Sequence, residues 1–153
     1  MAAGRDVVVV TALLGRPPRA DFEVVVRDTA GDPVVVRNAP FTADGTPMPT
    51  RYWLIGERST AVSQLESSGG VRAATDAVHP DALRAAHDAY AADRDAAIPS
   101  DHDGPRPSGG VGGTRMGIKC LHAHYAYYLA GGDDPVGRWV HAALTDVRVR
   151  EQA

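Results

Sequence analysis

The chain has 153 residues, a formal net charge of −3 and 44% hydrophobic residues. These values fit one globular domain with a moderate core, and they disfavour broad nucleic-acid binding, which needs a basic surface. No apolar run approaches the ~20 residues that a bilayer-spanning helix needs, so no membrane partner is expected. The single cysteine excludes an internal disulfide, and we expect a reducing, cytoplasmic location.

β-Branched runs separated by turns fill the first third of the chain. Residues 6–14 are compatible with a buried strand or a short helix, because periodicity does not separate the two in so short an apolar run. Residues 22–27 and 33–37 flank an Asp- and Gly-containing turn, which predicts a β-hairpin. Residues 50–55 predict a third strand. Together the three runs predict a small antiparallel sheet.

Helical patterns follow from residue 57 onward. Glycine pairs and prolines mark most of the helix ends. The expected helices span 59–68, 71–78, 81–97, 114–130 and 136–144. The segment at 99–113 is rich in Pro, Gly, Ser and Asp and predicts a mobile loop, whereas 145–150 predicts an edge strand or a loose tail. The predicted fold class is α+β: one domain, 1–153, with about three antiparallel strands packed by four or five helices.

The glycine-rich segment at 108–122 is the most distinctive in the chain. A glycine-rich loop that leads into a helix can direct backbone N–H groups at an anion. We expect Gly112 and Gly113 to supply such donors and Arg115 and Lys119 to add positive charge. The alternative is a flexible loop that precedes a core helix.

The predicted helix at 81–97 carries polar side chains on one stripe. At about 100° per residue, His87, Tyr90 and Arg94 fall on the same side of the helix. An inward-facing arginine pairs with a carboxylate or with an anionic ligand. Arg94 is therefore a candidate ligand-binding residue and His87 a candidate general base. The structural alternative is an internal ion pair, for instance between Arg94 and Glu57 or Glu66.

Cys120 and His122 raise two hypotheses. A thiol near a helix start, with Lys119 and Arg115 beside it, would have a depressed pKa, which suits a nucleophile. Its base would be His122, His124 or His87, and the alternative is a small core cysteine. The two residues lie about 200° apart around a helix, so they cannot share a metal unless the helix begins after Cys120. A zinc site would need further ligands such as His102 or Asp103. The spacing matches no standard zinc motif, so we predict no metal site, and the sequence does not say whether a cofactor is bound.

Two further features point to binding. The stiff turn at 15–19, Gly-Arg-Pro-Pro-Arg, presents two guanidinium groups that either bind an anion or remain solvated. These candidate ligand-binding residues are Arg16 and Arg19.

Tyrosines lie on more than one face of the predicted helix at 114–130, so one core is not expected to bury them all. An exposed tyrosine-rich face suits an interface, including a homodimer. The residues concerned are Tyr125, Tyr127, Tyr128 and Trp139.

Taken together, these segments resemble the DUF501 family, uncharacterised proteins found mainly in actinobacteria. The resemblance extends over residues 14–144. The matching segments are 15–19, 44–50, 52–54, 65–66, 87–95, 112–113, 119–123 and 135–138. The family has no established activity to carry over. Its members are often encoded near enolase, a septum-formation-initiator-like protein and an exopolyphosphatase-like protein.

This sequence departs from the family pattern in two places. Relatives often carry Thr-Cys-Pro where residues 55–57 are Ile-Gly-Glu, and a second histidine where Tyr127 stands. Both departures weaken a metal or paired-cysteine hypothesis. The remaining candidate members of one site are Arg16, Arg19, Glu66, His87, Tyr90, Arg94, Lys119, Cys120 and His122. The leading hypothesis is binding of a small anionic or phosphorylated ligand. The alternative is a non-enzymatic interaction protein linked to the cell envelope or division, and whether the protein is an enzyme stays open.

Overall fold

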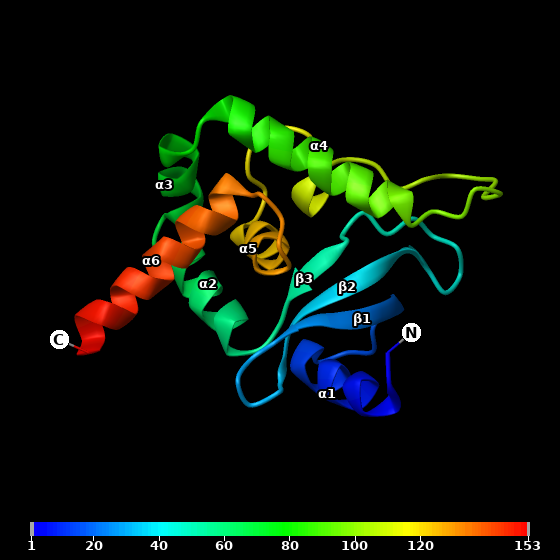
Figure 1. The fold of residues 1–153 in the computed structure, drawn as a ribbon, viewed down its shortest axis with the longest axis horizontal. Helices are drawn as coiled ribbons and strands as arrows, with labels where there is room; N and C mark the ends of the chain where they lie inside the picture. The colour runs from blue at the N-terminus through cyan, green and yellow to red at the C-terminus, as the bar shows by residue number, and fades with distance from the viewer. Residues whose placement is uncertain (1, 153) are drawn as a thin grey trace.

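The computed structural model describes residues 2–152, with side chains described to residue 146. It confirms the predicted α+β class, with one three-stranded antiparallel sheet (Figure 1). In chain order the elements are α1 (Gly4–Leu14), β1 (Ala20–Arg27), β2 (Pro33–Thr42), β3 (Tyr52–Leu54), α2 (Glu57–Ser67), α3 (Gly70–Ala77), α4 (Pro80–Ala96), the 3-10 turn η1 (Val111–Gly113), α5 (Leu121–Leu129) and α6 (Pro135–Gln152). The described residues thus form six α-helices where four or five were expected, because 4–14 takes its helical alternative.

The strands lie in the order β1-β2-β3, and both neighbouring pairs are antiparallel. The predicted hairpin is therefore confirmed. Its turn is closed by the side chain of Asp28, whose Oδ1 accepts hydrogen bonds from the backbone N–H groups of Ala30 and Asp32. The second strand extends beyond the predicted residue 37 to Thr42.

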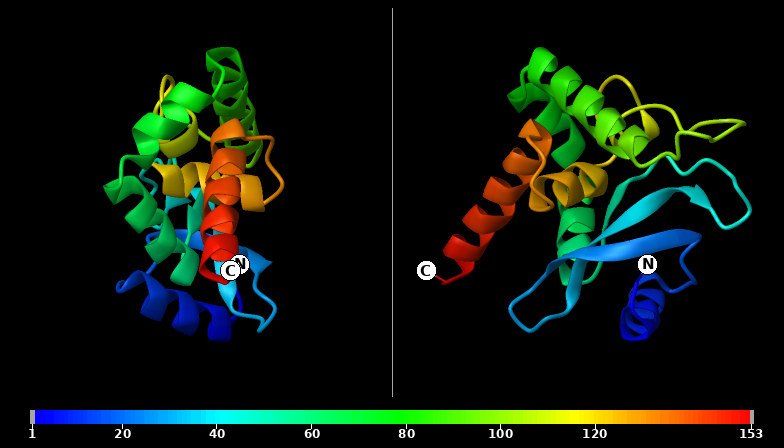
Figure 2. Two further views of the ribbon diagram at one scale, coloured as in Figure 1. Left: turned by 90° about the vertical axis from the view of Figure 1, so that its left-hand side faces the viewer. Right: turned by 45° about the vertical axis from the view of Figure 1, so that its right-hand side comes forward.

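The sheet separates two apolar clusters. Side chains alternate between its faces, so Val35 packs into the larger cluster while Val36 packs into the smaller one. The larger cluster lies against α2–α6 and includes Leu54 and Leu121. The smaller cluster lies against α1, where Val10 is fully buried. Figure 2 shows α1 on one side of the sheet and the other helices on the opposite side.

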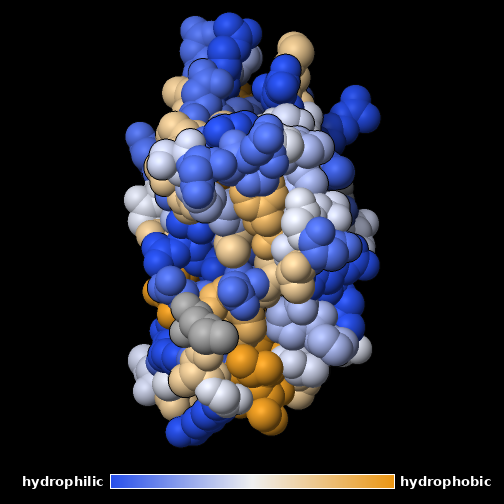
Figure 3. Space-filling view, turned by 90° about the vertical axis from the view of Figure 1, so that its right-hand side faces the viewer, coloured by the Kyte–Doolittle hydropathy of each residue, from blue (hydrophilic) through white to orange (hydrophobic). Residues whose placement is uncertain are grey.

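The helix α1 ends at Gly15, in a left-handed backbone conformation that residues with a side chain rarely adopt. Gly15 has φ 74° and donates its N–H to the carbonyl of Thr11, a left-handed helix ending. The outer face of α1 leaves Val7, Val8 and Leu13 exposed. Apolar surface is visible at the lower end of the molecule where α1 lies (Figure 3).

Two expected element boundaries are wrong. The helix after the glycine-rich segment begins at Leu121, not near 114, because glycines with positive φ, among them Gly112 and Gly117, interrupt the backbone before it. The tail at 145–150 continues α6 to Gln152 and forms neither an edge strand nor a loose end. No glycine or proline follows Gly137, so a helix that has begun can propagate. Between α4 and η1 the loop has no regular structure and projects beyond the end of α4 (Figure 1).

Candidate functional site

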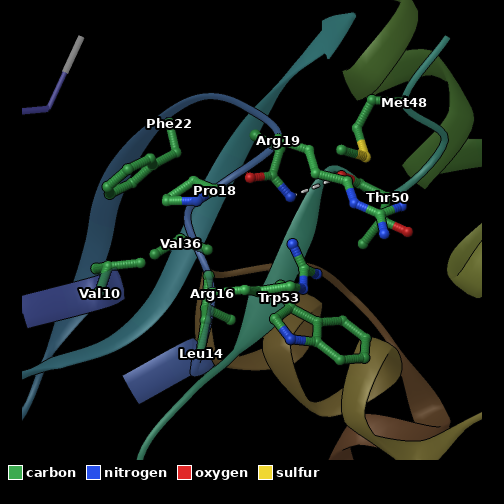
Figure 4. Close-up of a pocket in the computed structure, with 11 residues that line it drawn as sticks. Val10, Leu14, Arg16, Pro18, Arg19, Phe22, Val36, Met48, Thr50 and Trp53 are labelled. Atoms are coloured by element: carbon green, nitrogen blue, oxygen red, sulfur yellow. Dashed lines mark hydrogen bonds between the residues drawn. The ribbon is translucent and has the colours of Figure 1, made fainter. Parts of the chain in front are cut away.

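The turn between α1 and β1 places Arg16 and Arg19 at a cavity of about 200 Å³ that we call the arginine cavity. Its wall is mostly apolar and comes from α1, the adjacent face of the sheet and the indole of Trp53. Both guanidinium groups extend toward the Trp53 side of this cavity (Figure 4). The lining residues are Val10, Leu14, Arg16, Pro18, Arg19, Phe22, Val36, Asn38, Met48, Thr50 and Trp53.

The two arginines of this cavity lack acidic partners. Among residues 2–146, no carboxylate lies within ion-pair distance of Arg16 or Arg19, and the Nη1 atom of Arg16 contacts only the Pro17 carbonyl, at 3.5 Å. Some other surface arginines are paired, such as Arg27, which lies 2.7 Å from Asp6, whereas the exposed Arg84 on α4 has no acidic partner among the described residues. Both arginines are exposed, so water solvates their guanidinium groups, which remain available to an anion at the apolar wall.

The structure places Arg94 elsewhere and surrounds it with acceptors. Its side chain is 1% exposed, and its Nε donates to Asp95 at 3.0 Å. Its Nη1 donates to the carbonyls of Pro49 at 3.2 Å and Gly109 at 2.9 Å. The internal ion pair considered for Arg94 is therefore present, although Asp95 replaces Glu57 or Glu66 as the partner. Arg94 ties the loop to the end of α4.

A second cavity, of about 270 Å³, brings together Arg94 and Arg115. Asp88 and Asp95 line the same cavity, so the carboxylates balance the two guanidinium charges. Arg115 thus lies apart from the arginine cavity at residues 16–19. The predicted ligand-binding arginines are divided between two places.

The predicted glycine donors lie in the η1 turn. Gly113 donates its N–H to the carbonyl of Gly110, at 3.0 Å. The side chain of Lys119 is exposed and passes over Gly112, where an added Cβ would lie 3.5 Å from the Lys119 Cβ. The two glycines and Lys119 are therefore neighbours, as expected, but they do not line either arginine-containing cavity.

The N-terminus of α5 already holds an anion. The backbone N–H of Leu121 donates to Oε2 of Glu66, at 2.8 Å, and the N–H of Ala123 donates to the sulfur of Cys120, at 3.4 Å. A helix N-terminus attracts negative charge, and here α2 supplies it through Glu66. The anion expected at this helix start is therefore one of the protein's own side chains.

Both ring nitrogens of His87 are engaged within the fold. Its Nδ1 accepts from the N–H of Val111 at 3.0 Å, which assigns the proton to Nε2, and Nε2 donates to the carbonyl of Gly117 at 2.8 Å. Burial lowers the pKa of the imidazole and favours this neutral form. An added Cβ at Gly110 would lie 2.6 Å from the His87 side chain. His87 thus contacts the glycine-rich segment at two positions, Val111 and Gly117.

Glu66, Cys120 and His122 converge into what we call the thiol cluster. Oxygen, sulfur and nitrogen atoms of the three side chains all lie within 4.8 Å of one another, and each residue is partly exposed. The Nδ1 atom of His122 lies 3.1 Å from Oε1 of Glu66. This arrangement exists because α5 begins after Cys120, which is the condition that the sequence set for Cys120 and His122 to share an ion.

The thiol in this cluster is not activated as the sequence predicted. Burial first, and then the nearby Glu66 carboxylate, raises the pKa of Cys120 above its ordinary value. The expected depression of the pKa by Lys119 is outweighed. A raised pKa leaves less thiolate at neutral pH, so the nucleophilic role of Cys120 stays a prediction without support from this shift.

The aromatic residues of α5 pack into the core. Tyr125 and Tyr127 are buried, and Tyr127 stacks on Tyr52 with ring centroids 5.6 Å apart. Tyr90 is structural as well: its oxygen accepts hydrogen bonds from the backbone N–H groups of Arg51 at 2.6 Å and Tyr52 at 3.1 Å. Tyr128 and Trp139, the other two residues of the expected tyrosine-rich face, are half-buried against the same core, so part of that face still reaches the surface.

Fold and site geometry define a small α+β domain that carries an arginine cavity and, beside it, a cluster of a thiol, an imidazole and a carboxylate. A family model described as a protein of unknown function, DUF501, matches residues 24–142. The chain belongs to this family. No curated protein and no solved structure matches it. The matched range contains Trp53 and the whole thiol cluster, while Arg16 and Arg19 precede it. Within the described part of the chain, none of the helices is long and apolar enough to cross a membrane.

Proposed function

We propose that the protein binds a small anionic ligand with an apolar or planar body in the arginine cavity. The observation that carries this proposal is the pair of guanidinium groups without acidic partners at a mostly apolar cavity. Ligand sites are typically concave and apolar, with a few polar groups that fix orientation. A volume of about 200 Å³ favours a ligand smaller than a typical drug molecule.

Arg16 and Arg19 match the chemistry of phosphate and carboxylate. A guanidinium group donates through a planar fork that fits two oxygens of such an anion. The adjacent indole of Trp53 offers a flat surface for an aromatic or aliphatic group. An aryl phosphate combines both features and is the simplest probe for this cavity.

The anion site proposed here is not at the glycine-rich segment. Glu66 already occupies the N-terminus of α5, and Arg94 already has acceptors on both its Nε and Nη1 atoms. Arg115 shares its cavity with carboxylates. The arginine cavity is therefore the place where an external anion meets guanidinium groups that no carboxylate already neutralises.

A thermal-shift panel tests this function. Phenyl phosphate, benzoate and inorganic phosphate are compared on the wild type, because a ligand that binds only the folded state raises the melting temperature. We expect the largest rise with phenyl phosphate and none in the double variant Arg16→Ala, Arg19→Ala. Arg84→Ala is the matched control, since Arg84 is an exposed arginine on α4. An unchanged rise in the double variant, or no rise in the wild type, contradicts the proposal.

The Trp53→Leu variant tests the contribution of the indole separately from that of the two guanidinium groups. The variant keeps both guanidinium groups but loses the flat indole surface. The advantage of phenyl phosphate over inorganic phosphate should then shrink, while binding of inorganic phosphate persists. Equal selectivity in wild type and variant would remove Trp53 from the proposed site.

The interaction-protein hypothesis, with its link to the cell envelope or division, relied on an exposed tyrosine-rich face. Tyr125 and Tyr127 are buried while Tyr128 and Trp139 are half-buried, so this face offers less aromatic surface to a partner than expected. A homodimer stays a prediction that sedimentation equilibrium of the purified chain tests directly.

A further inference from the structure

We propose that the thiol cluster of Glu66, Cys120 and His122 binds a divalent, thiophilic metal ion such as zinc. Three different ligand types converge from two elements, because Glu66 lies on α2 while Cys120 and His122 flank the start of α5. Their ligand atoms lie within 4.8 Å of one another. This site is separate from the arginine cavity and does not rest on the proposed anion ligand.

Hydrogen bonds fix which nitrogen of His122 faces the cluster. The Nε2 atom lies 3.0 Å from the carbonyl of Ser59 and 3.0 Å from the hydroxyl oxygen of Ser63. A carbonyl only accepts, and the Ser63 hydroxyl itself donates to the Ser59 carbonyl, so Nε2 must carry a proton. Metal-binding histidines commonly donate their second ring N–H to a backbone carbonyl in this way.

The other nitrogen needs a cation beside it. Nδ1 of a neutral His122 presents a lone pair, and Oε1 of Glu66 lies 3.1 Å away with lone pairs of its own. Only a positive charge between these two atoms, a proton or a metal ion, makes the contact favourable. Two ligand atoms each ~2.0 Å from a tetrahedral zinc ion lie about 3.3 Å apart, close to the observed distance.

The carboxylate of Glu66 is also oriented so that one oxygen is available to a metal ion. Oε2 of Glu66 accepts the N–H of Leu121, which leaves Oε1 to face His122. Thiolate, imidazole and carboxylate together suit zinc better than calcium or magnesium, which prefer oxygen ligands. Three protein ligands leave a fourth position for water or another molecule.

An ion can reach the cluster from solvent. The side chains of His122 and Glu66 are 12% and 26% exposed. Cys120 can bind the ion without leaving its capping position, because its sulfur lies at the helix start as part of the cluster. The indole of Trp53 covers one side of the His122 ring, with ring centroids 6.0 Å apart.

Cobalt(II) titration of the full chain, in reducing buffer without chelator, tests the proposal. We expect one cobalt ion per chain and a thiolate-to-cobalt charge-transfer absorption. Cys120→Ser should lose this absorption while keeping a hydroxyl that can cap α5. His122→Ala and Glu66→Gln should each weaken binding at least tenfold, since even residues that only support a metal ligand contribute 10–100-fold, an order-of-magnitude guide. His141→Ala, which removes an exposed histidine on α6, should bind like the wild type.

Two results would overturn the metal site. One is the absence of stoichiometric cobalt binding by the folded wild type. The other is full binding by both His122→Ala and Glu66→Gln, which would reduce the signal to a single reactive thiol. If circular dichroism shows that a variant does not fold, the melting temperature of the wild type is measured with and without zinc instead. A rise in the melting temperature with zinc supports the site, and an unchanged melting temperature overturns it. The double variant Arg16→Ala, Arg19→Ala should bind cobalt normally, so failure of the anion site and failure of the metal site remain distinguishable.

Discussion

The indole of Trp53 stacks on the imidazole of His122, with ring centroids 6.0 Å apart and ring planes 22° apart. Trp53 also lines the arginine cavity. One side chain of β3 therefore separates the two proposed sites and contacts both. Its position makes the indole a natural reporter of binding on either side.

Tryptophan fluorescence should respond to both probes. The chain has two tryptophans, so Trp139→Phe leaves Trp53 as the sole indole emitter. In this variant we expect saturable emission changes on titration with phenyl phosphate and, separately, with zinc. Emission that stays constant with both, under conditions where binding is measured independently, would show that Trp53 adjoins neither site.

The buried hydroxyl of Tyr90 should contribute strongly to stability. Tyr90→Phe leaves the backbone N–H groups of Arg51 and Tyr52 without their acceptor in a buried setting. Loss of a buried partner costs about 1–3 kcal/mol, so urea denaturation should show a drop of that size in the free energy of unfolding. Tyr128→Phe is the control, because Tyr128 is only half-buried, and a change within about 0.5 kcal/mol is expected there. Equal stability of the two variants would contradict the role assigned to Tyr90.

Alkaline pH should destabilise the protein through two tyrosines. Burial raises the pKa of both Tyr52 and Tyr90 to about 12, and for Tyr52 the hydrogen bond to Asp93 adds to the effect. The unfolded chain loses these protons near pH 10, so it binds fewer protons than the folded state above that pH. The stabilising contribution is complete below about pH 10 and is lost as pH rises toward 12. Denaturation midpoints measured between these limits should fall, and less steeply for Tyr90→Phe; equal slopes would refute this assignment.

Close packing of the loop on His87 should make Gly110 intolerant of a side chain. In Gly110→Ala the new methyl group would lie 2.6 Å from atoms of the imidazole side chain, so either His87 or the loop must shift. Forcing extra atoms into a packed site typically costs 1–3 kcal/mol, about the loss we expect in thermal or urea denaturation. Gly4→Ala provides the matched comparison, because nothing lies within 4 Å of a Cβ there. A Gly110→Ala variant as stable as Gly4→Ala would show that His87 does not hold the loop.

Local sequence patterns predicted the sheet but not the start of α5. Valine-rich runs around a short turn are sufficient to predict a hairpin, and the opposite directions of Val35 and Val36 follow from strand geometry. The irregular backbone before Leu121 instead depends on His87, which contacts Val111 and Gly117 from a distant helix. Such contacts leave no periodic signal in the segment itself.

The residues of the thiol cluster were candidates, but their convergence was not predicted, for the same reason. Placing the helix start near residue 114 put Cys120 and His122 on different sides of one helix, whereas the true start allows them to converge. Glu66 lies on a separate helix, and the sequence suggested it only through the family motif and as a possible partner of Arg94, not as a neighbour of Cys120. Arg94 was correctly expected to face inward, but its carbonyl partners come from loops whose positions no spacing rule supplies.

Calorimetric titration of phenyl phosphate tests the central claim most directly. The arginine cavity predicts one binding site per wild-type chain and at least tenfold weaker binding in the double variant Arg16→Ala, Arg19→Ala, because each charge-assisted hydrogen bond contributes about 1.5–3 kcal/mol. Arg84→Ala should match the wild type. Equal affinity in the wild type and the double variant would contradict the assignment of the arginine cavity as a ligand site.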